Sequence, residues 1–219
     1  MQYRTNPKNG DRLSALGFGC MRFPKDYAES EALIARAIEA GVNYFDTAYV
    51  YAGNEITLGK ILASGGYRDG IKLATKLPHY LVRRYEDFDR IFETQLKRLQ
   101  TDRIDYYLIH MLASRSIWER LIALGVERWI AEKKARKEIV NIGFSYHGDR
   151  AEFPALLDCY DWDFCMIQYN YLDEYNQAGR SGLTSAHEQR PQEAAAMAFL
   201  HQSHAFRGAD AEESAAAGA

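Results

Sequence analysis

The stretch VNYFDTAYVYAGNEITLGKILASGGYRDGIKLATK, residues 42–76, decides the fold. It opens with an apolar run at 42–48 and closes with a second at 71–76. Between them, residues 54–66 are predicted to form a helix. Strand, helix and strand in this order are typical of a parallel sheet covered by helices.

The same alternation continues on both sides of this unit. Apolar runs predict six strands, at 16–20, 42–48, 71–76, 105–110, 139–145 and 164–170. Helices are predicted at 29–41, 54–66, 85–100, about 117–137 and near 152–159. Asn9-Gly10 predicts a two-residue hairpin turn ahead of the first strand. Near-continuous apolar strands indicate a parallel α/β sheet buried on both faces, either an open sheet or part of a barrel.

Composition narrows the class of protein. With 219 residues, 47% hydrophobic, the chain can bury one sizeable core. A formal net charge of -3 gives no reason to expect nucleic acid or an anionic membrane as partner. The N-terminus MQYRTNPKNG lacks the apolar region of a secretory signal, and Cys20, Cys159 and Cys165 form no C-x-x-C pair. We therefore expect a cytoplasmic protein with reduced thiols and no metal site.

Titratable residues stand where three of the predicted strands end. Asp46, Lys76 and His110 each follow an apolar run, and Tyr51 comes five residues after Asp46. The carboxyl ends of parallel strands are where catalytic groups gather in α/β folds. Each residue also has a structural interpretation: Asp46 as a turn cap, Lys76 as a loop residue, His110 as a buried imidazole, Tyr51 as one of fifteen tyrosines. Their combination favours a catalytic site.

Together these four side chains can form a proton donor for carbonyl reduction. Hydride addition to a carbonyl leaves an alkoxide that needs a proton. Tyrosine has a free pKa of about 10, and a neighbouring ammonium lowers the pKa of a phenol. Lys76 can supply that charge and Asp46 can anchor the lysine, while His110 can orient the carbonyl oxygen. The sequence therefore predicts Tyr51 as the general acid.

These residues lie in motifs that resemble those of the aldo-keto reductase superfamily. The motifs are LGFGCMRF (16–23), NYFDTAYVYAGNE (43–55), LATKLP (73–78), DYYLIH (105–110), IGFSYHGD (142–149) and MIQYNYLDE (166–174). They stand in the family's order and cover roughly residues 1–180. The resemblance implies a (β/α)8 barrel of the TIM type with an N-terminal β-hairpin across its bottom. It also implies an oxidoreductase that reduces aldehydes or ketones to alcohols, with Asp46, Tyr51, Lys76 and His110 as the catalytic tetrad.

The resemblance further implies a nicotinamide cofactor, NADPH or NADH. Gly19, Cys20 and Met21 would contact it after the first strand, and Ser145 and Gln168 would hold the carboxamide. Many relatives have Ser-Asn where this sequence has Ser145-Tyr146. The motifs are most similar to those of a bacterial branch of the superfamily that often carries a ferredoxin-like [4Fe-4S] segment. The clustered cysteines of such a segment are missing, so no iron–sulfur cluster is expected.

The C-terminal part departs from the family pattern. Residues 1–183 match a partial barrel of about six of the eight strands, whereas 184–219 form an Ala/Glu/His-rich tail. We expect this tail to be disordered or to form one short helix at 193–202. The abrupt change predicts an interrupted reading frame. The motifs of the last two strands, with the basic residues for the adenosine phosphate, are not matched there.

Several functions are compatible with a truncated barrel. The first is a reductase acting on a small carbonyl substrate, and the second a catalytically impaired product of an interrupted gene. A non-catalytic scaffold or regulatory barrel is the third, and an aldolase using Lys76 as a Schiff-base nucleophile the fourth. Open barrel edges also predict self-association, because unpaired strand edges recruit other chains.

Overall fold

A computed structural model describes residues 1–169, 172–188 and 195–199. Its strands are β1 (Tyr3–Thr5), β2 (Arg12–Ser14), β3 (Phe18–Gly19), β4 (Tyr44–Asp46), β5 (Lys72–Leu77), β6 (Ile104–Ile109), β7 (Ile139–Tyr146), β8 (Phe164–Gln168) and β9 (Ala195–Phe199). Its α-helices are α1 (Tyr27–Glu39), α2 (Asn54–Ser64), α3 (Glu86–Leu99), α4 (Arg115–Ala123), α5 (Val126–Ala135), α6 (Phe153–Leu157) and α7 (Gly179–Glu188). Two 3-10 turns lie at Arg68–Gly70 and His79–Leu81.

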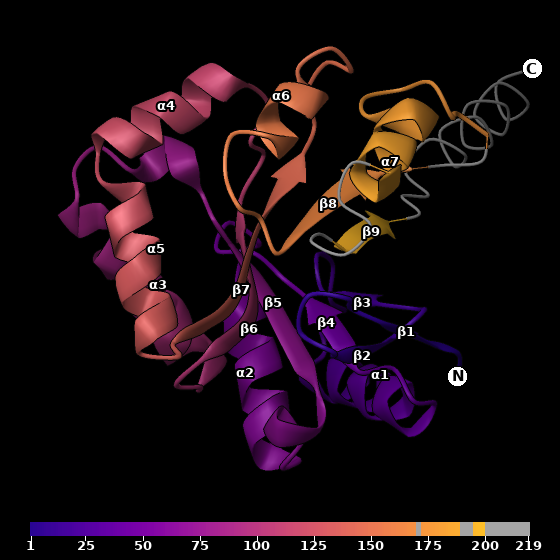
Figure 1. Cartoon of the computed structure of the whole chain (residues 1–219). Coiled ribbons are helices and arrows are strands. Elements are labelled where there is room, and N and C mark those ends of the chain that lie inside the picture. The colour runs from indigo at the N-terminus through magenta and orange to yellow at the C-terminus, as the bar shows by residue number, and fades with distance from the viewer. Residues whose placement is uncertain (170–171, 189–194, 200–219) are drawn as a thin grey trace, which may run out of the picture.

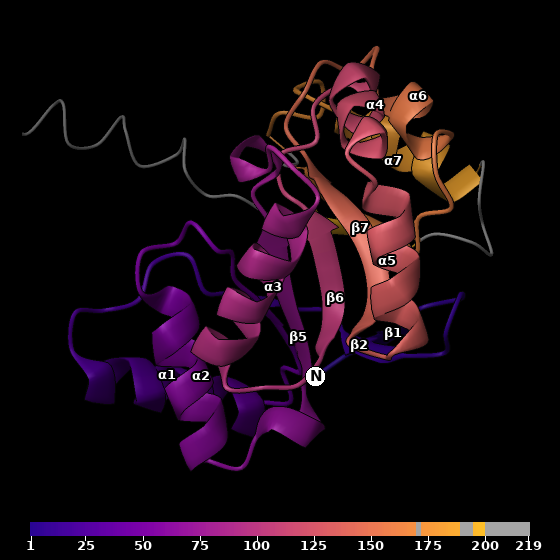
Figure 2. The ribbon, with the colours of Figure 1, turned by 90° about the vertical axis from the view of Figure 1, so that its left-hand side faces the viewer.

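One parallel sheet organises the molecule. Its strands follow the chain in the order β3-β4-β5-β6-β7-β8-β9, and each pairs in parallel with the next. The sheet curls into part of a barrel, with helices α1 to α5 along its outer side (Figures 1 and 2). Within the described residues, β3 and β9 are its two edge strands. The prediction of an incomplete α/β barrel is confirmed.

The C-terminal part corrects one prediction. The sequence predicts a short helix at 193–202, but Ala195–Phe199 forms strand β9, paired with β8 from Phe164↔Ala195 to Gln168↔Phe199. The six predicted parallel strands are therefore joined by a seventh. Helix α7 spans residue 183, at which the family pattern is predicted to stop. The rest of the tail, 200–219, lies outside the described residues.

The predicted hairpin is present, but its turn is longer than expected. β1 and β2 pair antiparallel, ending at Thr5↔Arg12, so residues 6–11 form the connection instead of Asn9-Gly10 alone. Gly10 adopts a φ of 78°, which suits glycine. The Tyr106 hydroxyl of β6 donates to Asp11 at 3.0 Å and accepts from Asn6 at 3.2 Å. The hairpin is thereby fixed to the barrel strands.

The single helix predicted at about 117–137 is two helices. α4 ends at Ala123 and α5 begins at Val126, with Gly125 between them at a φ of 90°. Such a conformation strains any residue with a side chain. The glycine therefore turns the chain between the two helices.

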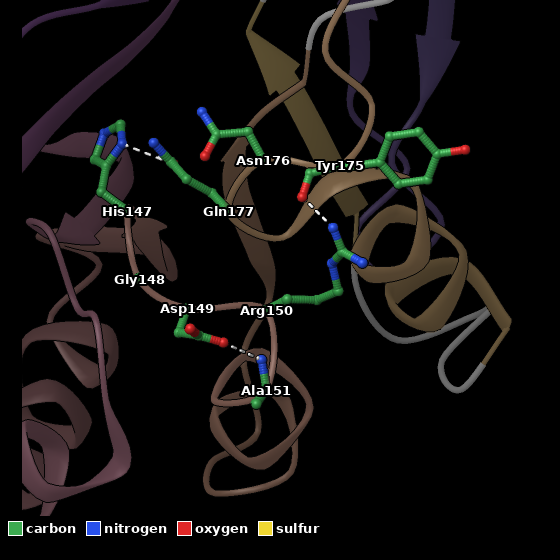
Figure 3. A pocket seen from close by; sticks show the side chains of 8 residues that line it. All are labelled: His147, Gly148, Asp149, Arg150, Ala151, Tyr175, Asn176 and Gln177. Atoms are coloured by element: carbon green, nitrogen blue, oxygen red, sulfur yellow. Dashed lines mark hydrogen bonds between the residues drawn. The ribbon is translucent and has the colours of Figure 1, made fainter.

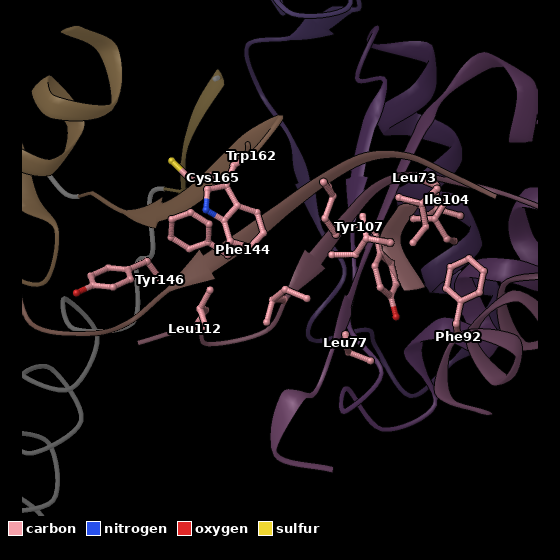
Figure 4. Packing of buried hydrophobic residues seen from close by; sticks show 14 of the residues in the cluster. Leu73, Leu77, Phe92, Ile104, Tyr107, Leu112, Phe144, Tyr146, Trp162 and Cys165 are labelled. Carbon is pink, nitrogen blue, oxygen red and sulfur yellow. The ribbon is translucent and has the colours of Figure 1, made fainter. Parts of the chain in front are cut away.

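Apolar side chains fill both faces of the sheet. Between strands and helices lies the larger cluster, which includes Leu73, Tyr107, Phe144 and Trp162 (Figure 4). A smaller cluster occupies the inner face of the curl and consists of Leu13, Tyr44, Ala74, Tyr106, Leu108, Phe164 and Met166. Burial on both faces explains the near-continuous apolar strands. In the described part of the chain, none of the helices has the length and apolarity needed to cross a bilayer.

Candidate active site

Strand alternation places three of the predicted residues on the inner face of the curl. Tyr44 and Ala74 belong to the inner cluster, so Asp46 and Lys76, two residues further along their strands, face the same side. His110 follows β6 directly, two residues after the inward Leu108. Because neighbouring strands are parallel, these side chains gather at one rim, the carboxyl end of the sheet.

Lys76 and Asp46 form a buried ion pair at this rim. Asp46 Oδ1 accepts a hydrogen bond from Lys76 Nζ, which also donates to the main-chain oxygen of Thr47 at 2.8 Å. The two residues are 2% and 5% exposed. Burial raises the pKa of Asp46, and the ammonium of Lys76 opposes that rise. The carboxylate and the carbonyl together compensate the desolvation of the ammonium, which a buried charge requires.

The Tyr51 ring lies beside this ion pair. Tyr51 stands in the loop between β4 and α2, and Lys76 Nζ is 5.1 Å from the centroid of its ring. The His110 ring meets the Tyr51 ring edge to face, with centroids 6.1 Å apart and planes at 87°. The structure thus brings the predicted phenol, ammonium, carboxylate and imidazole together at one place.

His110 is held as a neutral imidazole. The residue is 6% exposed, and burial, followed by the positive charge of Lys76, lowers its pKa to about 3. Its main-chain nitrogen donates to Leu77 O at 2.9 Å, which fixes the start of the loop after β6. Its Nδ1 is buried and has no hydrogen-bond partner among the described residues. A neutral imidazole donates from one nitrogen only, which suits a group that orients an oxygen atom.

The segment after β3 is fixed in place from behind. Cys20 donates from its main-chain nitrogen to Asp46 O at 2.7 Å, and Asn54 Nδ2 donates to the carbonyls of Cys20 and Met21 at 2.8 and 2.6 Å. Gly19 and Met21 are exposed, whereas the Cys20 side chain is fully buried. Burial raises the pKa of the Cys20 thiol well above its usual value. Cys20 therefore offers no reactive thiolate, and its main-chain nitrogen and oxygen are already hydrogen-bonded to Asp46 and Asn54.

Ser145 and Gln168 lie at the carboxyl ends of β7 and β8, on the same rim. The Ser145 hydroxyl accepts from the Met111 main-chain nitrogen at 2.8 Å, which leaves its own hydrogen to donate. The Gln168 carbonyl oxygen accepts from Gln177 Nε2 at 3.1 Å, which leaves the Gln168 amide as a donor. A hydroxyl and a side-chain amide are the groups that a carboxamide needs, so these residues fit the nicotinamide end of a dinucleotide. Tyr146 packs against buried aromatic rings instead.

An open groove lies between the loops that follow β7 and β8 (Figure 3). The residues lining it are His147, Gly148, Asp149, Arg150, Ala151, Tyr175, Asn176 and Gln177. His147 Nδ1 lies 3.1 Å from Gln177 Oε1, and Gln177 in turn contacts Gln168. The groove therefore adjoins the candidate carboxamide site. The sequence of 184–219 matches no basic residues for an adenosine phosphate, and 189–194 and 200–219 lie outside the described residues.

Several residues that support the site are not predicted from the sequence. Thr47 supplies a carbonyl to Lys76, and Asn54 holds the chain after β3. Glu55 and Gln95 form a buried network behind β5. The sequence offers one signal for Asn54 and Glu55: they end the motif NYFDTAYVYAGNE and open a predicted helix. Gln95 offers none, because a polar residue within a helix is usually exposed.

No candidate metal site is found in the part of the chain that the structure describes. It contains no group of three or more His, Cys, Asp or Glu side chains placed to hold an ion. The three cysteines are free thiols, and burial raises the pKa of Cys165 to about 12 and that of Cys159 to about 11.

Comparison with known proteins agrees with the geometry. The model of the Aldo/keto reductase family matches residues 15–181. An uncharacterized oxidoreductase, YrpG, of Bacillus subtilis is 33% identical over 147 residues, which cover 55% of this chain and 43% of that protein. A 9,11-endoperoxide prostaglandin H2 reductase of Trypanosoma cruzi is 36% identical over 129 residues, 58% of this chain and 44% of that protein. The chain thus spans less than half the length of these curated relatives.

Solved structures show the same likeness over most of the chain. An aldo-keto reductase from Bacillus halodurans, in its holo form, superposes with a TM-score of 0.73 at 26% identity, covering 90% of this chain and 65% of that one. An aldo/keto reductase from Brucella melitensis gives a TM-score of 0.69 at 27% identity, covering 90% and 72%. With a family match over residues 15–181 and the expected four side chains at one rim, this chain belongs to the aldo/keto reductase family.

Proposed function

We propose that this chain reduces the carbonyl group of an aldehyde or ketone to an alcohol, with NADPH or NADH as the hydride donor. The observation that carries the proposal is the arrangement around Tyr51. Its ring has the Lys76 ammonium 5.1 Å from the centroid and the His110 ring 6.1 Å away. A phenol between an ammonium and a neutral imidazole can donate a proton to an oxygen bound at the same rim.

Each residue of the site has a distinct task in this proposal. Tyr51 gives its hydroxyl proton to the oxygen of the carbonyl as negative charge develops there. Lys76, held by Asp46 and Thr47, keeps a positive charge beside the phenol and so stabilises the phenolate that remains. His110 stays neutral near pH 7 and donates a hydrogen bond that orients the same oxygen.

Main-chain and amide groups fit the cofactor. When bound, the nicotinamide supplies the hydride that adds to the carbonyl carbon. Ser145 and Gln168 would hold the carboxamide, and the exposed main chain at Gly19 and Met21 would lie beside the cofactor. Asn54 prevents this segment from moving by holding two successive carbonyls. The ion pair of Lys76 with Asp46 also favours this chemistry over a Schiff-base aldolase, which needs an uncharged lysine.

The test is NADPH oxidation in the presence of 4-nitrobenzaldehyde. We expect Tyr51→Phe to lower kcat by about 10²- to 10⁴-fold, the usual contribution of a general acid. Tyr80→Phe is the control, since this tyrosine is 49% exposed and lies in the loop after β5. NADPH fluorescence titration measures cofactor binding and so separates an active enzyme from a truncated product that is unable to hold the cofactor. Binding without turnover by the unaltered chain, or equal rates for both variants, would exclude the proposal.

A further inference from the structure

A buried carboxylate outside the four-residue site links two of its parts. Glu55 lies in the first turn of α2, four residues after Tyr51, and is 1% exposed. Its Oε2 pairs with Arg98 Nη1 at 3.1 Å. Its Oε1 accepts from Thr75 Oγ1 at 2.7 Å and from Gln95 Nε2 at 3.0 Å. A fully buried carboxylate with three partners on two other elements is costly to build, and the catalytic proposal does not use it.

One side of this network fixes the strand that carries Lys76. Thr75 precedes Lys76, and alternation turns its side chain toward the helices while Lys76 faces the inside of the curl. Gln95 Nε2 lies 2.9 Å from Thr75 Oγ1 and 3.1 Å from the main-chain oxygen of Lys76. Gln95 is in turn oriented by the Tyr107 hydroxyl, which donates to its Oε1 at 2.7 Å. The backbone of Lys76 is therefore held from behind.

The other side fixes the loop that carries Tyr51. Arg98 Nη1, paired with Glu55, donates to the main-chain oxygen of Tyr49 at 3.2 Å. The Arg98 guanidinium also lies over the Tyr49 ring, 4.4 Å from its centroid. Tyr49 is two residues before Tyr51, and Glu55 itself lies in the first turn of the helix that ends this loop. The loop is therefore tied to Glu55 at both of its ends.

We propose that Glu55 is a positioning residue that sets the distance between the Tyr51 phenol and the Lys76 ammonium. It touches neither group; it acts through Arg98 on the loop and through Thr75 and Gln95 on the strand. Its consequence for turnover rests on the proposed function, but the spacing itself can be measured without any reaction. Displacing a catalytic group by about 1 Å can cost about 100-fold in rate.

The spacing is measured by NMR on protein labelled with [13C]lysine. The ring current of Tyr51 shifts the Lys76 methylene resonances. The chemical shifts of these resonances are therefore compared between each protein and the same protein carrying Tyr51→Leu, and the difference reports how close the two side chains are. We expect Glu55→Gln to shrink this difference, because the amide loses the Arg98 pairing. Lys133→Met is the control: it removes a buried ammonium from its pairs with the partly exposed Asp89 and Glu138, on the far side of α3, and should leave the difference unchanged.

Kinetics provide the second readout. If the chain reduces carbonyls, Glu55→Gln should lower kcat about 100-fold with little change in the KM for aldehyde. Lys133→Met should change neither. Should Glu55→Gln fail to fold, Thr75→Val removes the strand side of the network with little change of volume and should also shrink the NMR difference. An unchanged NMR difference in the folded variants would overturn the inference. A reduced difference in a protein without reductase activity would support it and exclude only the proposed function.

Discussion

Removing the charge that faces Lys76 should destabilise the fold more than any other change at the site. In Asp46→Leu the ammonium stays buried, 2% exposed, with only Thr47 O as a partner at 2.8 Å. Breaking a buried ion pair from one side costs about 3–5 kcal/mol. Because one carbonyl remains, we expect a loss near the lower limit, about 3 kcal/mol. Lys76→Met leaves a buried carboxylate whose pKa burial already raises, and its cost should be similar or smaller.

The double variant Asp46→Leu, Lys76→Met shows whether the two charges act as one unit. Replacing a buried pair by apolar side chains of similar size is often close to neutral. We expect the double variant to lose about 1 kcal/mol or less, which is smaller than either single loss. Urea unfolding at pH 7, followed by circular dichroism, gives all four free energies of unfolding. Losses that add within about 0.5 kcal/mol would show that the pair is not coupled and would refute the reasoning.

Three further predictions concern other parts of the molecule. Burial lowers the pKa of His110 to about 3 in the folded protein, against 6.5 for the free group, so the unfolded state takes up the proton first as the pH falls. The wild-type protein should therefore lose about 2 kcal/mol of stability between pH 7 and pH 5 through this residue, and His110→Asn should remove that loss. An unchanged pH profile of the free energy of urea unfolding would contradict this. Gly59→Ala should lower the free energy of unfolding by about 1–3 kcal/mol despite alanine's better helix propensity, because the new Cβ would lie 2.3 Å from the main-chain oxygen of Arg98. Gly70→Ala is the control, since a Cβ there would have no atom within 4 Å. Equal melting temperatures for the two variants would exclude the clash. Within the described residues β3 and β9 are the edge strands of the sheet, and we expect such edges to let the chain associate with itself. Sedimentation velocity should then show a sedimentation coefficient that rises with concentration, and a constant monomer value would contradict this.

The repeating part of the fold is well predicted by the sequence, because burial on both faces leaves a strong signal. The predicted strand at 71–76 is β5 (Lys72–Leu77), and that at 139–145 is β7 (Ile139–Tyr146). Helix length is predicted less well. The amphipathic pattern continues through 117–137, and only the single glycine at 125 indicates that the chain turns there.

The tail shows how tertiary context overrides local preference. Alanine is the strongest helix former, so EAAAMAFLHQ favours a helix by composition. In the fold, the exposed edge of β8 offers unpaired backbone groups to the same segment, and Ala195–Phe199 pairs with it as β9. No local pattern in the sequence could reveal that edge.

The catalytic rim is predictable to the extent that strand ends mark it. Asp46, Lys76 and His110 follow apolar runs, so their common rim follows from the sequence alone. The residues that support this rim from the side of the helices cannot be predicted in this way. Glu55 and Gln95 meet because α2 and α3 pack side by side against β5. Contacts between side chains on different helices produce no regular residue spacing that could be recognised in the sequence.

The most direct test of the proposed carbonyl reduction at the rim is isotope transfer. NADPH deuterated at the transferable position is incubated with 4-nitrobenzaldehyde, and the alcohol is analysed by mass spectrometry. The geometry around Tyr51 predicts an alcohol carrying one deuterium on the former carbonyl carbon, with its yield almost abolished by Tyr51→Phe. No deuterated alcohol from the unaltered chain, or equal yields from the variant, would contradict it.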